Sequence, residues 1–125
     1  MQRWDLSAPA RGDRSGPQVL FSTPEARAVV IDLAVDEEMG DHGVRERAVL
    51  EVVSGSLAVT CGGSVVTCDA GTLAVFDPGE RRSIRALAPT RLLLMLAPWP
   101  GPDHYQPGER DDPHALPAHA SLPQL

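Results

Sequence analysis

The sequence V-T-C-G-G-S-V-V-T-C, residues 59–68, decides the fold of this 125-residue chain. Two runs of β-branched residues meet at Gly62-Gly63, and a glycine pair in this setting predicts a β-hairpin with a two-residue turn. Residues 40–55 (G-D-H-G-V-R-E-R-A-V-L-E-V-V-S-G) and 71–84 (G-T-L-A-V-F-D-P-G-E-R-R-S-I) flank the hairpin and read as strands around tight turns. Turn signals recur about every ten positions, and helical periodicity is missing, so the sequence predicts an all-β sandwich or barrel.

The two flanking segments resemble the two sequence motifs of the cupin superfamily. V-V-S-G-S-L at residues 52–57 is similar to the end of the first motif, and G-T-L-A-V-F-D-P-G-E-R-R-S at residues 71–83 is similar to the second. The resemblance covers residues 26–97 and implies a small, single-domain, RmlC-like cupin. Its fold would be an antiparallel double-stranded β-helix, also called a jelly-roll barrel, between an irregular N-terminal segment (residues 1–25) and a Pro-rich tail (residues 98–125).

The resemblance also implies where a metal site would lie. Cupins usually bind a metal inside the barrel through two His and a Glu of the first motif and one His of the second. On this pattern His42 stands at the first position, while Val44, Ala48 and Arg82 stand at the other three. An arginine there opposes a bound cation with its own positive charge, so we expect a degenerate metal site and no metal cofactor. The alternative is one divalent transition metal held through His42, Glu46 and a further residue outside the family pattern.

The strand period of two supports an inward position for the same residues. His42 and Glu46 share the parity of the apolar residues that follow them, and Arg82 shares the parity of Ile84 and Ala86. We therefore predict His42, Glu46 and Arg82 as the ligand-binding residues and assign no catalytic residue. Three interpretations of this set stay open: a purely structural role with Arg82 at the barrel rim, a pocket for an anion, and a metal site.

The remaining strands are predicted from alternating apolar residues. Residues 19–22 form a short strand, residues 27–35 a half-buried one with Val35 facing inward, and residues 36–43 an acidic, glycine-containing turn. The predicted core consists of Val29, Ile31, Leu50, Val52, Leu57, Val59, Val75, Ile84, Leu93 and Met95.

The last strand, residues 91–97, is apolar on both faces and needs cover on both, by the other sheet and by either a terminal segment or a second subunit, of which we favour the second subunit. We expect a homodimer in which sheet faces pack together and the N-terminal segment, with Trp4, crosses toward the partner.

Composition limits the classes of partner. The net charge is −6 and the chain has no lysine, which argues against a nucleic-acid surface. No apolar run approaches the ~20 residues that span a membrane, and no secretory signal is evident, so a cytoplasmic location is expected. Cys61 and Cys68 lie too far apart along the hairpin for an unstrained disulfide and are expected to be reduced.

The functional expectation follows from the fold and the three site residues. We expect a metal-free cupin that binds a small polar or anionic metabolite in the barrel, as a sensor, carrier or accessory protein. The alternative is a metal-dependent enzyme of the oxygenase or isomerase type. The Pro-rich tail holds His104, His114 and His119 without metal-ligand spacing and is expected to be dispensable beyond residue 106.

Overall fold

The computed structural model describes residues 1–8, 16–42 and 44–98, and all regular structure in these residues is β. The described residues form nine strands: β1 (Gly16–Ser22), β2 (Arg27–Leu33), β3 (Glu38–His42), β4 (Arg47–Ser54), β5 (Ser56–Cys61), β6 (Ser64–Asp69), β7 (Leu73–Phe76), β8 (Arg82–Ala86) and β9 (Thr90–Ala97). The prediction of an all-β chain is confirmed.

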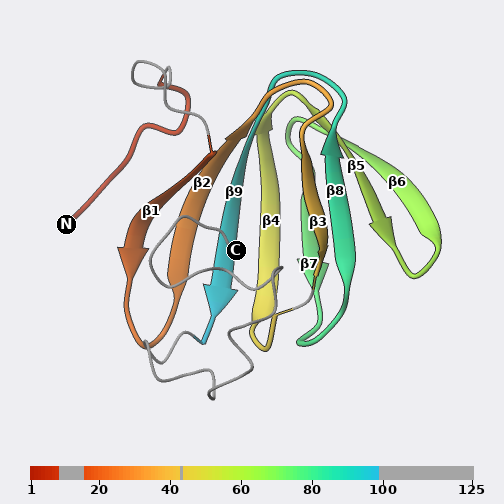
Figure 1. The fold of residues 1–125 in the computed structure, drawn as a ribbon. Coiled ribbons are helices and arrows are strands. Elements are labelled where there is room, and N and C mark those ends of the chain that lie inside the picture. Colours follow the sequence, from red (N-terminus) through yellow and green to blue (C-terminus); the bar gives the residue numbers. More distant parts are fainter. Residues whose placement is uncertain (9–15, 43, 99–125) are drawn as a thin grey trace.

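The strands form two antiparallel sheets that enclose one core. The five-stranded sheet has the order β1-β2-β9-β4-β7 and the four-stranded sheet the order β3-β8-β5-β6. Figure 1 shows the strands standing side by side, with the β7–β8 turn at the lower end of the barrel and the β2–β3 and β8–β9 connections at the upper end. This double-stranded β-helix is the predicted architecture.

The predicted hairpin lies where the glycine pair places it. Cys61 pairs with Ser64, and the turn between them is made by Gly62 (φ 61°) and Gly63 (φ 83°). Both residues adopt left-handed backbone conformations that glycine reaches at no steric cost. Cys68 pairs with Leu57 instead, several residues along the ladder, and both cysteines are free thiols.

The core contains inward-facing side chains of both sheets. The buried cluster is Val29, Ile31, Leu33, Val44, Ala48, Leu50, Val52, Leu57, Val59, Cys68, Phe76, Ile84, Ala86, Leu92, Leu94 and Leu96. Three predicted core residues are wrong, because Val75 is 53% exposed and Leu93 and Met95 are half-buried on the outer face of the sheet. In strands that are apolar on both faces, alternation alone does not say which face is inside.

Residues 36–43 differ from the predicted turn. Glu38–His42 form strand β3, which pairs with β8 with a register shift between Met39 and His42. The turn itself is shorter and centres on Asp36, whose φ is 67°. Since β2 already ends at Leu33, Val35 lies outside the strand and is exposed, contrary to the prediction.

The N-terminal segment contacts its own chain. Trp4 stacks on Phe21 of β1 with 5.9 Å between ring centroids, so the tryptophan does have a surface to pack on. The guanidinium of Arg91 donates hydrogen bonds to the carbonyls of Leu6 and Ala8. Strand β1 makes residues 16–22 part of the five-stranded sheet. A crossing of this segment to a partner stays a prediction, and the tail beyond Pro98 lies outside the described residues.

Gly55, at the turn between β4 and β5, is required by close backbone approach. Its φ is 92°, and an added Cβ would lie 2.4 Å from the carbonyl oxygen of Pro89. Gly71 has nearly the same φ (93°) but has no atom within 4 Å of that position. We expect Gly55→Ala to lower the free energy of unfolding by well over the ~1–2 kcal/mol that a left-handed alanine costs, and Gly71→Ala by that backbone cost alone. Urea unfolding measures both, and equal losses would contradict the clash.

Candidate functional site

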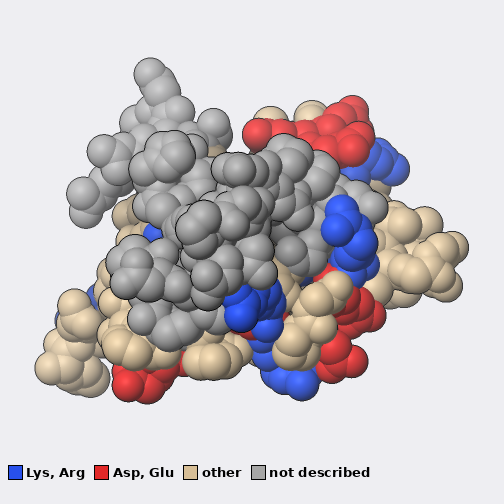
Figure 2. Space-filling view, turned by 60° about the horizontal axis from the view of Figure 1, so that its bottom comes forward, with Lys and Arg blue, Asp and Glu red and all other residues tan. Residues whose placement is uncertain are grey.

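The candidate site lies at the end of the barrel where the β7–β8 turn meets the segment before β4, which we call the mouth. The amide of Gly79 donates a hydrogen bond to the carbonyl of Val44 at 2.7 Å and ties the two segments together. An exposed ion pair joins Arg47 to Asp77 at 2.8 Å. Figure 2 views the molecule from this side and shows arginine and acidic side chains intermixed on the described surface.

Arg82 lies inside the barrel at the mouth. It begins β8, the strand between β3 and β5, and has the same inward parity as Ile84 and Ala86. Only 1% of the residue is exposed, and its guanidinium carbon lies 4.9 Å from the centroid of the Phe76 ring. A cation over an aromatic face is attracted by the ring quadrupole, more strongly when it is desolvated. The predicted alternative of a rim arginine is therefore wrong: Arg82 belongs to the interior.

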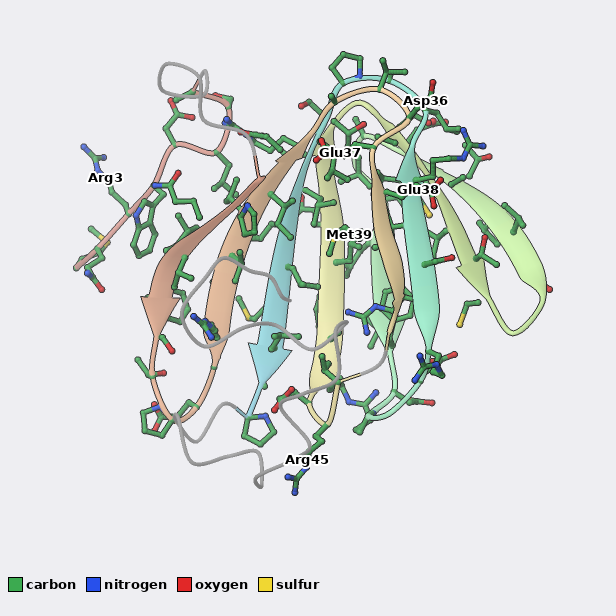
Figure 3. All side chains as sticks on the ribbon, viewed as in Figure 1. Arg3, Asp36, Glu37, Glu38, Met39 and Arg45 are labelled. Atoms are coloured by element: carbon green, nitrogen blue, oxygen red, sulfur yellow. The ribbon has the colours of Figure 1, made fainter. Side chains whose placement is uncertain are left out.

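Glu46 also points inward and is 1% exposed. Exposure alternates along this segment, since Arg45 and Arg47 are exposed on either side of it. Figure 3 shows Arg45 at the mouth, directed away from the barrel. Glu46 precedes Ala48 by two residues on the same face, and Ala48 pairs directly with Phe76. The buried carboxylate of Glu46 and the buried guanidinium of Arg82 thus both lie on the inner side of the barrel near Phe76.

His42 occupies the same row of the four-stranded sheet as Arg82. In the ladder His42 is opposite Arg82, and Arg82 is opposite Cys61 of β5. Residues directly opposite each other in an antiparallel ladder share a face, so the backbone assigns His42 to the inner face. The side chain of His42 lies outside what the structure describes, and its predicted ligand-binding role stays a prediction.

Cys61 and Glu80 add a second polar pair to the mouth. The Cys61 thiol donates a hydrogen bond to Oε2 of Glu80 at 3.0 Å. Oε1 of the same carboxylate accepts from the backbone amide of Asp77 at 2.9 Å, which closes the β7–β8 turn. The turn therefore fixes this carboxylate beside the thiol.

The hydrogen bond between Cys61 and Glu80 raises the pKa of the thiol and lowers the pKa of the carboxyl group. The hydrogen bond to Glu80 is the main cause that raises the pKa of the Cys61 thiol above its ordinary value, and burial and the carboxylate charge add to it. The same hydrogen bond, followed by the amide of Asp77, lowers the pKa of Glu80. A raised pKa favours the protonated thiol, which is a weaker nucleophile than the thiolate.

The lowered pKa of Glu80 predicts a pH dependence of stability. A carboxyl whose folded pKa lies below its unfolded value stabilises the fold fully above the unfolded pKa, which is ordinarily 4.5. That contribution is lost as the pH falls through the folded pKa. We expect the difference in unfolding free energy between the natural protein and Glu80→Gln to be constant above about pH 5 and to narrow below it. Urea titrations from pH 7 to pH 3 measure it, and a difference that does not change with pH would contradict the contact.

The described residues do not fit the metal site that the fold family implies. Among them, no group of three His, Cys, Asp or Glu side chains is arranged to hold a metal ion. Val44 and Ala48, at two family ligand positions, are buried and have no metal-binding atom in their side chains. At the fourth family position stands the permanent cation of Arg82, which repels a metal.

Sequence reasoning missed three residues of the mouth: Cys61, Phe76 and Glu80. The parity of Leu57 and Val59 extends to Cys61 and was sufficient to place it inside. The sequence prediction places the neighbouring β-branched residue Val75 in the core and therefore leaves Phe76 out of it. The contact of Glu80 with Cys61 joins positions 19 residues apart, and no local pattern signals it.

A separate groove lies at the opposite end of the barrel. It has a volume of about 380 Å³ and lies between the N-terminal segment and the ends of β2, β4 and β9. On its wall Arg91 forms two hydrogen bonds to the carboxylate of Asp32, at 2.7 and 3.0 Å. The hydrogen bonds to Asp32 are the main cause that raises the pKa of Arg91. This guanidinium is already engaged by Asp32 and by the carbonyls of Leu6 and Ala8, so the groove serves to anchor the N-terminal segment.

Comparison with known proteins agrees with this architecture. No family model and no curated protein matches the chain. An RmlC-like cupin from Desulfovibrio desulfuricans is 18% identical and superimposes with a TM-score of 0.71, over 78% of this chain and 97% of that one. A double-stranded β-helix protein from Klebsiella pneumoniae is 20% identical, with a TM-score of 0.69 over 81% and 94% of the two chains. KdgF from Halomonas sp. is 19% identical, with a TM-score of 0.63 over 66% and 76%.

These similarities show the fold, which is that of the small RmlC-like cupins. The expected cupin architecture is thereby confirmed. In the described part of the chain, no helix has the length and apolarity needed to cross a membrane.

Proposed function

We propose that this cupin barrel binds a small polar or anionic metabolite at its mouth without a metal, as a sensor, carrier or accessory protein. The observation that carries the proposal is the buried guanidinium of Arg82 over Phe76, at the position where the family pattern has a metal ligand. Apolar residues of similar volume often stabilise a fold as well as a buried ion pair does. Stability alone therefore does not account for an arginine here, whereas recognition of a carboxylate or phosphate does.

The mouth also defines how such a ligand would be held. Arg82 supplies donors for an anionic group, and Phe76 supplies an apolar wall beside it. Glu46 balances the charge of Arg82 when no ligand is present and accepts hydrogen bonds from ligand hydroxyl groups when one is. Because Arg82 and Glu46 are both buried, a ligand reaches them only if the mouth opens locally.

The alternative of a metal-dependent oxygenase or isomerase has no observation in its favour among the described residues. A cytoplasmic location, in which both thiols stay reduced, completes the proposal.

Isothermal titration calorimetry tests the proposal with malonate, citrate and inorganic phosphate as probes. We expect saturable binding of at least one of these anions to the natural protein, and loss of at least tenfold in affinity in Arg82→Gln, about 1.4 kcal/mol or more. Arg47→Gln, which removes an exposed arginine from the same end of the barrel, is the matched control and should bind as before. Equal binding by Arg82→Gln and the natural protein would contradict the proposal.

A further inference from the structure

Strand β6 is an open sheet edge with an unusual composition. In the described part of the chain its one ladder partner is β5, and it is the last strand of the four-stranded sheet. Figure 1 shows β6 at the margin of the molecule, beyond β5. Val65 is 65% exposed and Val66 is 57% exposed, and the neighbouring Ser64 and Thr67 are exposed as well. Apolar β-branched residues therefore lie on both faces of a strand whose outer edge pairs with no other described strand.

The three other edge strands carry features that oppose pairing with a further strand. β1 contains Pro17 and a register shift between Val19 and Phe21. β3 has a register shift of its own and the acidic residues Glu38 and Asp41. β7 is only four residues long. Proline, bulges, charges and short length are the devices by which natural sheets avoid edge-to-edge association.

β6 has none of these devices over most of its length. It runs for six residues in continuous register with β5, without proline, and its single charged residue, Asp69, is the last one. The contrast with the other edges marks β6 as a strand kept open for pairing. We propose that β6 is an interaction surface on which a second copy of this chain docks, β6 against β6, so that two four-stranded sheets join into one of eight strands.

The second copy fits this edge because the strand is self-complementary. Antiparallel pairing of two identical strands has twofold symmetry and closes with two copies. If Val66 lies opposite Val66 of the second copy, Val65 lies opposite Thr67, so the central cross-strand pairs are β-branched, and Ser64 lies opposite Cys68. The two Asp69 residues then lie six positions apart, about 20 Å at ~3.4 Å per residue. That separation exceeds two Debye lengths of about 8 Å at physiological salt, so their repulsion is screened.

Sedimentation velocity on the full chain tests the proposal. We expect the natural protein to dimerise at concentrations on the order of 100 µM, because a single strand pair is a small interface of modest affinity. Val66→Lys places like charges opposite each other and should weaken the dimer at least tenfold. Val75→Lys is the matched control: it places the same charge at an exposed valine on the outer face of the other sheet and should leave the dimer intact.

A charge-swap experiment tests the register itself. Val66→Lys and Val66→Glu should each be monomeric, and an equimolar mixture should form a mixed dimer. Circular dichroism confirms that each variant is folded. If Val66→Lys is not folded, Val65→Lys, whose lysine lies opposite Thr67 within the same interface, replaces it in the sedimentation test and should also weaken the dimer. A monomeric natural protein, or a dimer lost in Val75→Lys and kept in Val66→Lys, would overturn the proposal; the second result would support packing of the sheet faces instead.

Discussion

Replacing Arg82 by alanine is expected to lower the free energy of unfolding by about 3–5 kcal/mol. Arg82 is 1% exposed, and so is Glu46 on the same inner side of the mouth. If Arg82 compensates the charge of Glu46, its removal leaves a carboxylate in a desolvated region without an opposite charge, and the contact of the guanidinium with Phe76 is lost as well. Urea unfolding at pH 7 measures the loss.

Two further variants separate charge compensation from packing. If Arg82 and Glu46 compensate each other, the double variant Arg82→Met/Glu46→Gln should lose less stability than the two single variants summed, by about 0.5–3 kcal/mol. A strictly additive double variant would show that the two charges do not interact. If Arg82→Ala lowers the free energy of unfolding by less than about 1 kcal/mol, the Arg82 side chain contributes no more to stability than an exposed arginine does.

The triple variant Val44→His, Ala48→Glu, Arg82→His is expected to gain a divalent metal. It restores the side chains of the family pattern at three positions and removes the cation, while His42 already stands at the first. Val44, Ala48 and Arg82 are all buried at the mouth. Histidine at position 82 is shorter than arginine, and this difference provides space for the new carboxylate at position 48. Inductively coupled plasma mass spectrometry after loading with Zn²⁺ or Mn²⁺ measures the content, with about one ion per chain expected.

Val44→His with Ala48→Glu alone, which keeps Arg82, is the control for this gain. It should hold far less metal than the triple variant, because the guanidinium repels the ion. Equal metal content in the natural protein and the triple variant would contradict the account of Arg82.

Much of the fold could be predicted because its signals are local. The glycine pair Gly62-Gly63 fixes the β5–β6 hairpin through backbone conformations that other residues avoid, and the register of Cys61 with Ser64 follows from it. The inward parity of Arg82 followed from Ile84 and Ala86, since the neighbouring Arg81 and Arg85 leave only one apolar face on this strand. Where one face of a strand is clearly polar, the alternation of side chains along the strand is sufficient to predict which of them face inward.

The remaining features depend on contacts between segments far apart in the sequence. β9 is apolar on both faces, and only its pairing with β2 and β4 decides that Leu92 and Leu94 face inward rather than Leu93. β3 is acidic in sequence and forms a strand because β8 offers it a ladder, with Asp36 beside Arg85 at 3.3 Å. The depth of Arg82 could not be predicted either, because period two gives the face of a strand and not the distance to solvent.

Native mass spectrometry of the purified protein, produced without a His-tag, tests the central claim most directly because it detects a bound metal and a bound small molecule in one spectrum. The account predicts a barrel without a stoichiometric transition metal that takes up a small anion, added as malonate, citrate or phosphate, and that loses it in Arg82→Gln. A protein that carries one transition metal per chain, or that holds the anion equally well without the Arg82 guanidinium, would contradict it.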